Sequence, residues 1–265
     1  MSSAVFRDAS SAVLRVRLAR SDEDLFAVQR LRYRVFIEEM GGDGPLVDHQ
    51  LGLERDELDP IFDHLLLIDE ARPIEDNNYV VGAYRLLPDT RLEEAGRFYC
   101  DDEFDLAPLR SSGKRLLELG RSCIDPDYRG GVGMLKMWQG LAEYVLRNNI
   151  EILFGAASFP DDNPSRWVQS LSWLHQDYMA PEHLRVSARH AGSFVPLAPD
   201  LIDRRQAALQ TPGLIRGYLR LGGFIGDGVF VDTAFKTTDV CIILDTSKLT
   251  AQARNLSRQA SGLMG

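Results

Sequence analysis

Hydrophobic and polar residues follow two different periods along the chain, and each period predicts one type of element. Residues 13–18 carry mostly alternating apolar side chains, which indicates a first strand. After Ser21 the apolar residues recur every three or four positions, which predicts a helix capped by this serine, with acidic residues in its first turn. The same period predicts a helix over 134–145, and a third helix can open at Asn163-Pro164.

Short apolar segments between these helices predict the strands. They are residues 62–69, 79–87, 115–124, 150–157, 228–234 and 238–245. The polar connection between the first two is typical of a hairpin, and residues 93–107 predict one short helix. This order of elements predicts an α+β fold in which helices flank one mixed, mostly antiparallel sheet.

The length of 265 residues suits one large domain, or an ordinary domain that carries an insertion. We expect a mobile N-terminus over 1–11, a single domain over 12–246 and a C-terminal tail over 247–265. Residues 178–220 do not fit the alternation of elements, and they contain six arginines against three acidic residues. We interpret this segment as a basic insertion.

Composition narrows the class of protein. The formal net charge of −9 argues against a protein that coats a nucleic-acid duplex. The three cysteines, Cys100, Cys123 and Cys241, are widely spaced, which argues against a disulfide framework or a zinc site. Because neither a signal-peptide pattern nor an apolar run of about 20 residues is present, we expect a cytoplasmic protein. A location at the inner face of the membrane is a second option.

A glycine-rich turn follows the predicted strand over 115–124 and precedes a helix. Its residues are Arg129, Gly130, Gly131, Val132 and Gly133. Such a turn lets the backbone approach a phosphate, and the N–H groups of the following helix can bind it. The P-loop and dinucleotide-binding patterns are both absent. A simple strand-to-helix turn is the alternative.

This turn resembles the acyl-thioester-binding turn of GCN5-related N-acyltransferases, whose pattern is Gln/Arg-x-x-Gly-x-Gly/Ala. Gly131 and Gly133 match the glycines, whereas Tyr128 stands at the position of the usual Gln or Arg, and Arg129 is shifted by one. The departure favours the phosphopantetheine of a carrier protein over coenzyme A, because one phosphodiester needs a weaker cradle than a pyrophosphate.

Other segments resemble two branches of this superfamily. Residues 34–36, 82–88 and 118–121 are similar to acyl-homoserine-lactone synthases, while 118–133, 211–219 and 235–240 more closely resemble the N-acyltransferases of ornithine lipid synthesis. The latter resemblance covers most of 12–246. It implies a GCN5-related N-acyltransferase fold and transfer of a 3-hydroxyacyl chain from acyl carrier protein to the α-amine of L-ornithine, which gives lyso-ornithine lipid.

That reaction implies an acyl-(acyl carrier protein) thioester as co-substrate, with no permanently bound cofactor and no metal. Direct attack in a ternary complex needs a group that accepts the amine's proton or orients it. Glu118 is the preferred group, and a β-bulge at Gly120 would bring it to the same face as Arg121. A surface Glu–Arg pair is the alternative. We interpret Cys123 as a buried core residue rather than a nucleophile.

Recognition of ornithine requires carboxylates for its ammonium groups and an arginine for its carboxylate. Residues 38–63 contain nine acidic residues against one arginine. From this segment Asp56, Asp59 and Asp63 are candidates for the ammonium groups. Arg34 and Arg85 are candidates for the carboxylate. For any single acidic residue, the alternative that it only keeps an exposed loop hydrated and binds no substrate is nearly as good.

Carrier proteins are acidic, so docking requires a local basic surface. The candidates are Arg110, Lys114, Arg115, Arg129 and Lys136, with the insertion as second choice.

Residues 250–264 have a weak amphipathic pattern that suits a membrane surface. Two alternative functions stay open: an acyl-homoserine-lactone synthase, which usually has a tryptophan that this chain lacks near residue 40, and a non-catalytic lipid-binding module.

Overall fold

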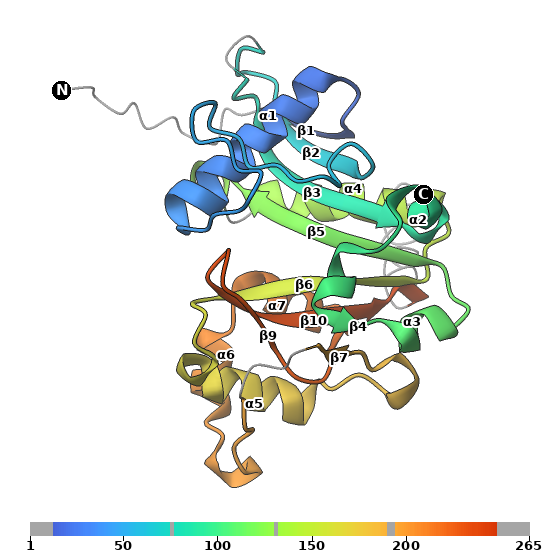
Figure 1. The fold of residues 1–265 in the computed structure, drawn as a ribbon, viewed down its shortest axis with the longest axis vertical. Coiled ribbons are helices and arrows are strands. Elements are labelled where there is room, and N and C mark those ends of the chain that lie inside the picture. Colours follow the sequence, from blue (N-terminus) through green and yellow to red (C-terminus); the bar gives the residue numbers. More distant parts are fainter. Residues whose placement is uncertain (1–12, 75–76, 130–131, 190–193, 248–265) are drawn as a thin grey trace, which may run out of the picture. The chain divides into compact units, whose positions relative to one another are not determined.

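The computed structural model describes residues 13–74, 77–129, 132–189 and 194–247 (Figure 1). The chain forms two compact units. The first contains residues up to Leu86 together with Arg121–Glu143, and the second contains Leu87–Gly120 and the residues from Tyr144 onward. Each unit has its own part of the predicted β-structure and is described separately.

The first unit combines an antiparallel sheet with two long helices. Its elements are β1 (Leu14–Leu18), α1 (Asp22–Arg32), the π-helix η2 (Tyr33–Glu39), β2 (Asp63–Asp69), most of β3 (Val80–Pro88), the last residues of β5 (Leu116–Ile124), η5 (Pro126–Tyr128) and most of α4 (Val132–Arg147). β2 pairs with β1 and with β3 in antiparallel registers. The N–H of Asp125, directly after β5, donates to the carbonyl of Val81.

Helix α1 begins where the sequence predicts. The Ser21 hydroxyl accepts the N–H of Asp24 at 3.4 Å, as an N-cap does. Asp24 is itself buried and accepts hydrogen bonds from the Arg17 guanidinium and the Tyr79 hydroxyl. The apolar side of α1, including Val28 and Leu31, lies in one core cluster with residues of β2, β3 and β5.

The second unit contains the rest of the β-structure. Its strands are the first residues of β5, β6 (Ile152–Pro160), β8 (Phe224–Ile225), β9 (Phe230–Asp232) and β10 (Thr237–Asp245), together with a separate pair, β4 (Phe104–Asp105) and β7 (Ser187–Ala188). β5 and β6 are parallel, whereas β10 pairs with β6, β8 and β9 in antiparallel registers. The predicted mixed, mostly antiparallel sheet flanked by helices is therefore confirmed.

Short helices make up much of the second unit. They are η3 (Asp89–Arg91), α2 (Leu92–Ala95), η4 (Tyr99–Asp102), α3 (Ala107–Ser111), η6 (Pro164–Trp167), α5 (Val168–Asp177), η7 (Glu182–Leu184), η8 (Pro199–Leu201), α6 (Arg204–Gln210) and α7 (Gly213–Arg220). The segment interpreted as an insertion contributes β7, α6 and α7. It packs against α5, because the Ser170 hydroxyl donates to the carbonyl of Ala207. No helix in the described part of the chain is long and apolar enough to cross a membrane.

β5 loses its regular pairing in the middle of the strand. Its parallel register with β6 runs from Leu116–Ile152 to Glu118–Phe154. Beyond that point the carbonyl of Leu119 approaches Gly155 so closely that a Cβ atom there would lie 2.1 Å from the oxygen. Arg121 then adopts a left-handed backbone conformation, with φ 48°, one residue after the predicted bulge at Gly120.

We predict that Gly155→Ala destabilises the protein by about 3 kcal/mol, because the Leu119 carbonyl belongs to the backbone and the strand must shift to admit a methyl group. Gly213→Ala is the matched control, since a Cβ at Gly213 meets no atom within 4 Å. Urea unfolding of both variants measures the difference. Equal unfolding midpoints for the two variants would contradict the close approach of β5 and β6.

Candidate active site

The carboxylate of Glu118 is buried in the second unit and fixed by the backbone. Its two oxygens accept the N–H groups of Tyr99 at 2.9 Å and Cys100 at 2.7 Å, and the residue is 1% exposed. The same segment is anchored by Phe98, whose ring contacts that of Phe154 edge-on at 5.0 Å. A carboxylate has the chemistry to accept a proton or to orient an amine.

Arg121 belongs to the first unit, where it contacts the acidic segment. Its guanidinium donates to Glu54 at 3.1 Å and to Asp56 at 3.2 Å. These bonds occupy one side of a larger network, which we call the arginine network: Arg32, Arg85 and Arg121 with Glu54, Asp56 and Asp59. Its cations and carboxylates are equal in number, so the network is formally neutral.

Arg32 and Arg85 lie at the centre of the arginine network, where they are 0% and 1% exposed. Arg32 donates to Glu54 and to both oxygens of Asp59, while Arg85 donates to Asp59 at 3.0 Å and to Asp56 at 2.5 Å. Removing one partner would leave a buried charge uncompensated, which costs about 3–5 kcal/mol.

The pKa values of the network's aspartates reflect this pairing. Burial alone would raise the pKa of Asp59, but the charge and hydrogen bonds of Arg32 outweigh it, and Arg85 adds to them, so the pKa lies well below its usual range. The pKa of Asp56 is also lowered, because Arg85 and Arg121 outweigh the effect of burial. Both side chains are thus held as carboxylates by arginines of the same unit.

The residues predicted to recognise ornithine have different surroundings. Asp59 and Arg85 are committed to each other inside the arginine network. The side chain of Asp56 is 19% exposed. Asp63 is the first residue of β2 and is half-buried. Arg34 lies elsewhere in the first unit, where it donates to Asn78 at 3.0 Å and pairs with Asp125, and 31% of its side chain is exposed.

The glycine-rich turn is described only in part, because Gly130 and Gly131 lie outside the described residues. Tyr128 points inward: its hydroxyl donates to Asp69 at 2.6 Å, and burial together with this bond raises its pKa to about 12. Arg129 makes a two-fold contact with Glu39 at 2.5 Å. A Cβ at Gly133, the second residue of α4, would lie 2.8 Å from the carbonyl of Tyr128, so a larger residue there would force the turn to shift.

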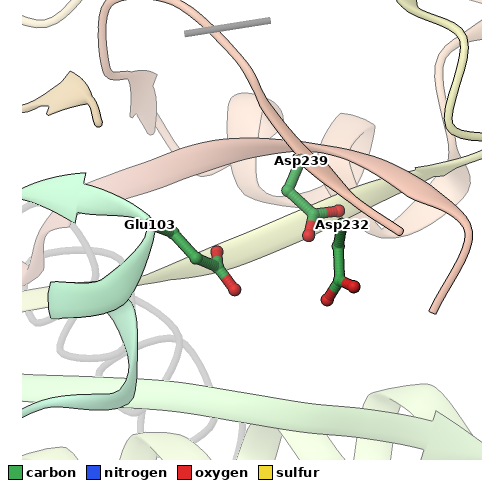
Figure 2. A group of neighbouring side chains, drawn as sticks. All are labelled: Glu103, Asp232 and Asp239. Atoms are coloured by element: carbon green, nitrogen blue, oxygen red, sulfur yellow. The ribbon is translucent and has the colours of Figure 1, made fainter. Parts of the chain in front are cut away.

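A group of carboxylates that the sequence reasoning missed lies in the second unit (Figure 2). Glu103 follows η4, and Asp232 and Asp239 come from the β9–β10 hairpin; one oxygen of each lies within 4.8 Å of the others. We call these residues the carboxylate cluster. Such a group can hold a cation. Three segments supply it, so no local motif could have revealed it.

Comparisons with known proteins identify the family. A model of the acetyltransferase (GNAT) domain matches residues 31–139. L-ornithine N(alpha)-acyltransferase of Rhodobacter capsulatus is 53% identical over 93% of this chain and 96% of its own length. The enzyme of the same name from Brucella abortus is 41% identical over 90% and 86%. This chain belongs to the L-ornithine N(alpha)-acyltransferase family.

Solved structures agree with this fold. The CoA-dependent acyl-homoserine lactone synthase BjaI, solved with SAM and isopentyl-CoA, aligns over 92% of this chain and 90% of its own with a TM-score of 0.51 and 13% identity. The family model and the curated relatives confirm the resemblance to GCN5-related N-acyltransferases, and they show that the chain is an acyltransferase.

The cysteines of this acyltransferase are poorly suited to a covalent step. Cys123 lies in the core cluster of the first unit, and burial raises its pKa to about 12. Burial also raises the pKa of Cys100 and of Cys241. A thiolate is the reactive form, so burial disfavours the reactive form of these thiols.

The basic residues predicted for docking are mostly paired with acids. Arg110 contacts Asp101, Lys114 contacts Asp245, and Arg115 contacts Asp89. Arg129 is paired with Glu39 in the same way. Their positive charges are thus partly neutralised within their own units, which reduces the basic field that an acidic partner meets.

We predict that Asp59→Asn lowers the free energy of unfolding by about 3–5 kcal/mol at pH 7, because it leaves Arg32 and Arg85 short of a buried counter-charge. The folded-state pKa of Asp59 lies below its unfolded value of about 3.9, so its contribution is complete above that pH. It is lost as the pH falls through the folded-state pKa. The gap between the variant and the wild type should therefore narrow in acid.

Urea unfolding between pH 7 and pH 3 measures that gap. Asp22→Asn is the control, since Asp22 is exposed in the first turn of α1 and should change the stability by less than about 1 kcal/mol. A small or pH-independent effect of Asp59→Asn would show that the arginine network does not stabilise the first unit.

Proposed function

We propose that this acyltransferase moves a 3-hydroxyacyl chain from acyl carrier protein to the α-amine of L-ornithine and forms lyso-ornithine lipid. The relatives' names support ornithine as the acceptor, because the chain matches them over almost their whole length. The observation that carries the mechanism is the fixed, buried carboxylate of Glu118. No observation favours the lactone-synthase or the non-catalytic alternative over this function.

The amine attacks the thioester carbonyl directly in a ternary complex. The buried, protonated cysteines support this route, since none of them is activated as a nucleophile. The attacking nitrogen loses a proton as the C–N bond forms, and the thiolate of phosphopantetheine leaves with the electrons of the C–S bond. Glu118 accepts or directs that proton, and Arg121 holds the acidic segment next to β5.

The phosphopantetheine arm is proposed to bind the turn formed by residues 129–133. The inward orientation of Tyr128 supports a weak phosphate cradle, because its hydroxyl is already used by Asp69. Arg129 is 43% exposed and can exchange Glu39 for a phosphate. For the acceptor, Arg34 remains the better candidate for the carboxylate, since Arg85 is buried within the arginine network.

We extend the proposal to a reversible contact with the inner face of the membrane, because the product is an amphiphile. The predicted contact, residues 250–264, lies outside the described residues. The apolar side of α7, in the segment interpreted as an insertion, is another candidate for this contact. It buries Ile215, Tyr218 and Leu219 in its own unit, so most of that side is already used. Vesicle flotation of the full chain and of a chain ending at Lys248 tests the tail: equal flotation would exclude it.

We predict that Glu118→Gln lowers kcat at least about 100-fold, because an amide cannot accept the proton. The variant also replaces one acceptor of a backbone N–H, so some stability is lost, about 1–3 kcal/mol. Glu151→Gln is the matched control, since Glu151 also accepts a backbone N–H, that of Arg115. Rates are compared where circular dichroism shows both variants folded; a kcat within about threefold of wild type would exclude Glu118 as the base.

We predict that the 3-hydroxyacyl carrier protein is a better donor to ornithine than the same acyl chain on coenzyme A. Salt should raise the KM for the carrier protein, because charge attraction is screened over about 10 Å at 0.1 M ionic strength. An acyl N-acetylcysteamine thioester, which has neither carrier nor phosphate, controls for effects of salt on the chemistry. Equal kcat/KM with both natural donors would overturn the choice of acyl carrier protein.

A further inference from the structure

The carboxylate cluster has the composition of a cation site. Glu103 and Asp239 are each 3% exposed, and Asp232 is half-buried. Figure 2 shows the three side chains on the same side of β10, with Glu103 reaching in from the segment after η4. One oxygen of Asp232 accepts the N–H groups of Ala234 and Phe235, which fixes this carboxylate at the hairpin turn. The cluster therefore concentrates negative charge in a defined place.

Thr237 provides an independent observation at this cluster. It is 3% exposed, and its hydroxyl finds no hydrogen-bond partner among the residues that the structure describes. Thr237 is paired directly opposite Asp232 in the β9–β10 register and lies two residues before Asp239, so all three side chains leave the same face of the hairpin. A buried hydroxyl without a hydrogen-bond partner lowers the stability of the fold unless a ligand or a water molecule forms that hydrogen bond.

The carboxylate cluster shares a sheet face with Glu118. Glu118 is paired with Phe154 on β6, and Asp239 is paired with Ser158, four residues further along the same strand. Residues two or four positions apart on a strand project to the same face. Glu118 and Asp239 therefore line one continuous face of the second unit.

The turn formed by η4 joins the two groups more directly. The N–H of Cys100 donates to Glu118, and the carbonyl of Cys100 accepts the N–H of Glu103. Burial raises the pKa of Cys100, and the negative charges of Glu118 and Glu103 raise it further, so both carboxylates act on the same thiol. Glu103 is thus linked to the proposed base, Glu118, through the backbone of Cys100, and it also belongs to the carboxylate cluster with the β9–β10 hairpin.

This cluster differs from the acidic segment that the sequence singled out. The carboxylates of Glu54 and Asp59 are neutralised by arginines of their own unit and are almost completely buried. The carboxylate cluster belongs to the unit that contains Glu118. An acceptor with two ammonium groups needs one position where the amine loses its proton and a second where a charged ammonium is held.

We propose that Glu103, Asp232 and Asp239, together with the Thr237 hydroxyl, bind the side-chain ammonium of the diamine acceptor. The inference rests on the proposed function. An ammonium group has three N–H donors, which match the three carboxylates of the cluster. Holding the distal nitrogen there as a cation keeps it from attacking the thioester and leaves the α-amine beside Glu118.

The test compares L-ornithine with L-norvaline, which has the same carbon skeleton without the side-chain ammonium. The full-length protein is assayed with a 3-hydroxyacyl carrier protein, and amino-acid binding is measured separately by calorimetry. Asp232→Asn and Asp239→Asn keep the size of the side chain and remove its charge. Asp200→Asn, at an exposed position of η8, is the control, and Thr237→Val removes the hydroxyl alone.

We expect both cluster variants to raise the KM and the dissociation constant for ornithine at least about tenfold, and to leave kcat/KM for norvaline within about threefold. Equal losses with both amino acids would mean that the carboxylates only support the fold, and would overturn the proposal. Loss of ornithine turnover with a chelator and its recovery with Ca²⁺ or Mg²⁺ would also overturn it, in favour of a metal site.

The binding measurement separates this inference from the proposed function. Absence of acylated ornithine with wild-type protein would overturn the proposed function. In that case, weaker ornithine binding by Asp232→Asn and Asp239→Asn than by the wild type would still support the cation site. Equal dissociation constants for the wild type and both variants would overturn it.

Discussion

The buried arginine network is the interaction on which the first unit depends most. Arg32, Arg85 and Arg121 come from a helix and two strands, and they meet three carboxylates supplied by residues 54–59. Desolvating so many charges is tolerable only when each has a partner. The network therefore fixes the acidic segment against α1, β3 and the end of β5 through the ion pairs of Glu54, Asp56 and Asp59.

A second constraint acts in β5. The strand pairs with β6 only as far as Glu118, the Leu119 carbonyl then touches Gly155, and the left-handed Arg121 turns toward the network. Because of this departure from regular pairing, two residues only three positions apart have different partners. Glu118 accepts backbone N–H groups in the second unit, while Arg121 forms ion pairs in the first unit.

The sequence was most informative where the signal is local. Apolar segments located the longer strands but not the two-residue strands β4, β7 and β8. The Ser21 cap of α1 followed from residue type alone. The family followed from strings such as residues 118–133. By contrast, Asp59 is paired with Arg32 and Arg85, which lie 27 and 26 positions away from it in the sequence. The carboxylate cluster joins Glu103 to a hairpin beyond residue 229, and only tertiary structure brings such residues together.

The π-helical continuation of α1 over Tyr33–Glu39 could not be predicted from the sequence either, because its apolar spacing is close to that of an α-helix.

We infer that the enzyme recognises the acceptor's distal ammonium with the carboxylate cluster rather than with the acidic segment. A crystal structure with bound L-ornithine tests it most directly. We expect its side-chain nitrogen within about 3 Å of oxygens of Glu103, Asp232 and Asp239. The same nitrogen bound instead to Asp56 or Asp63 would contradict it.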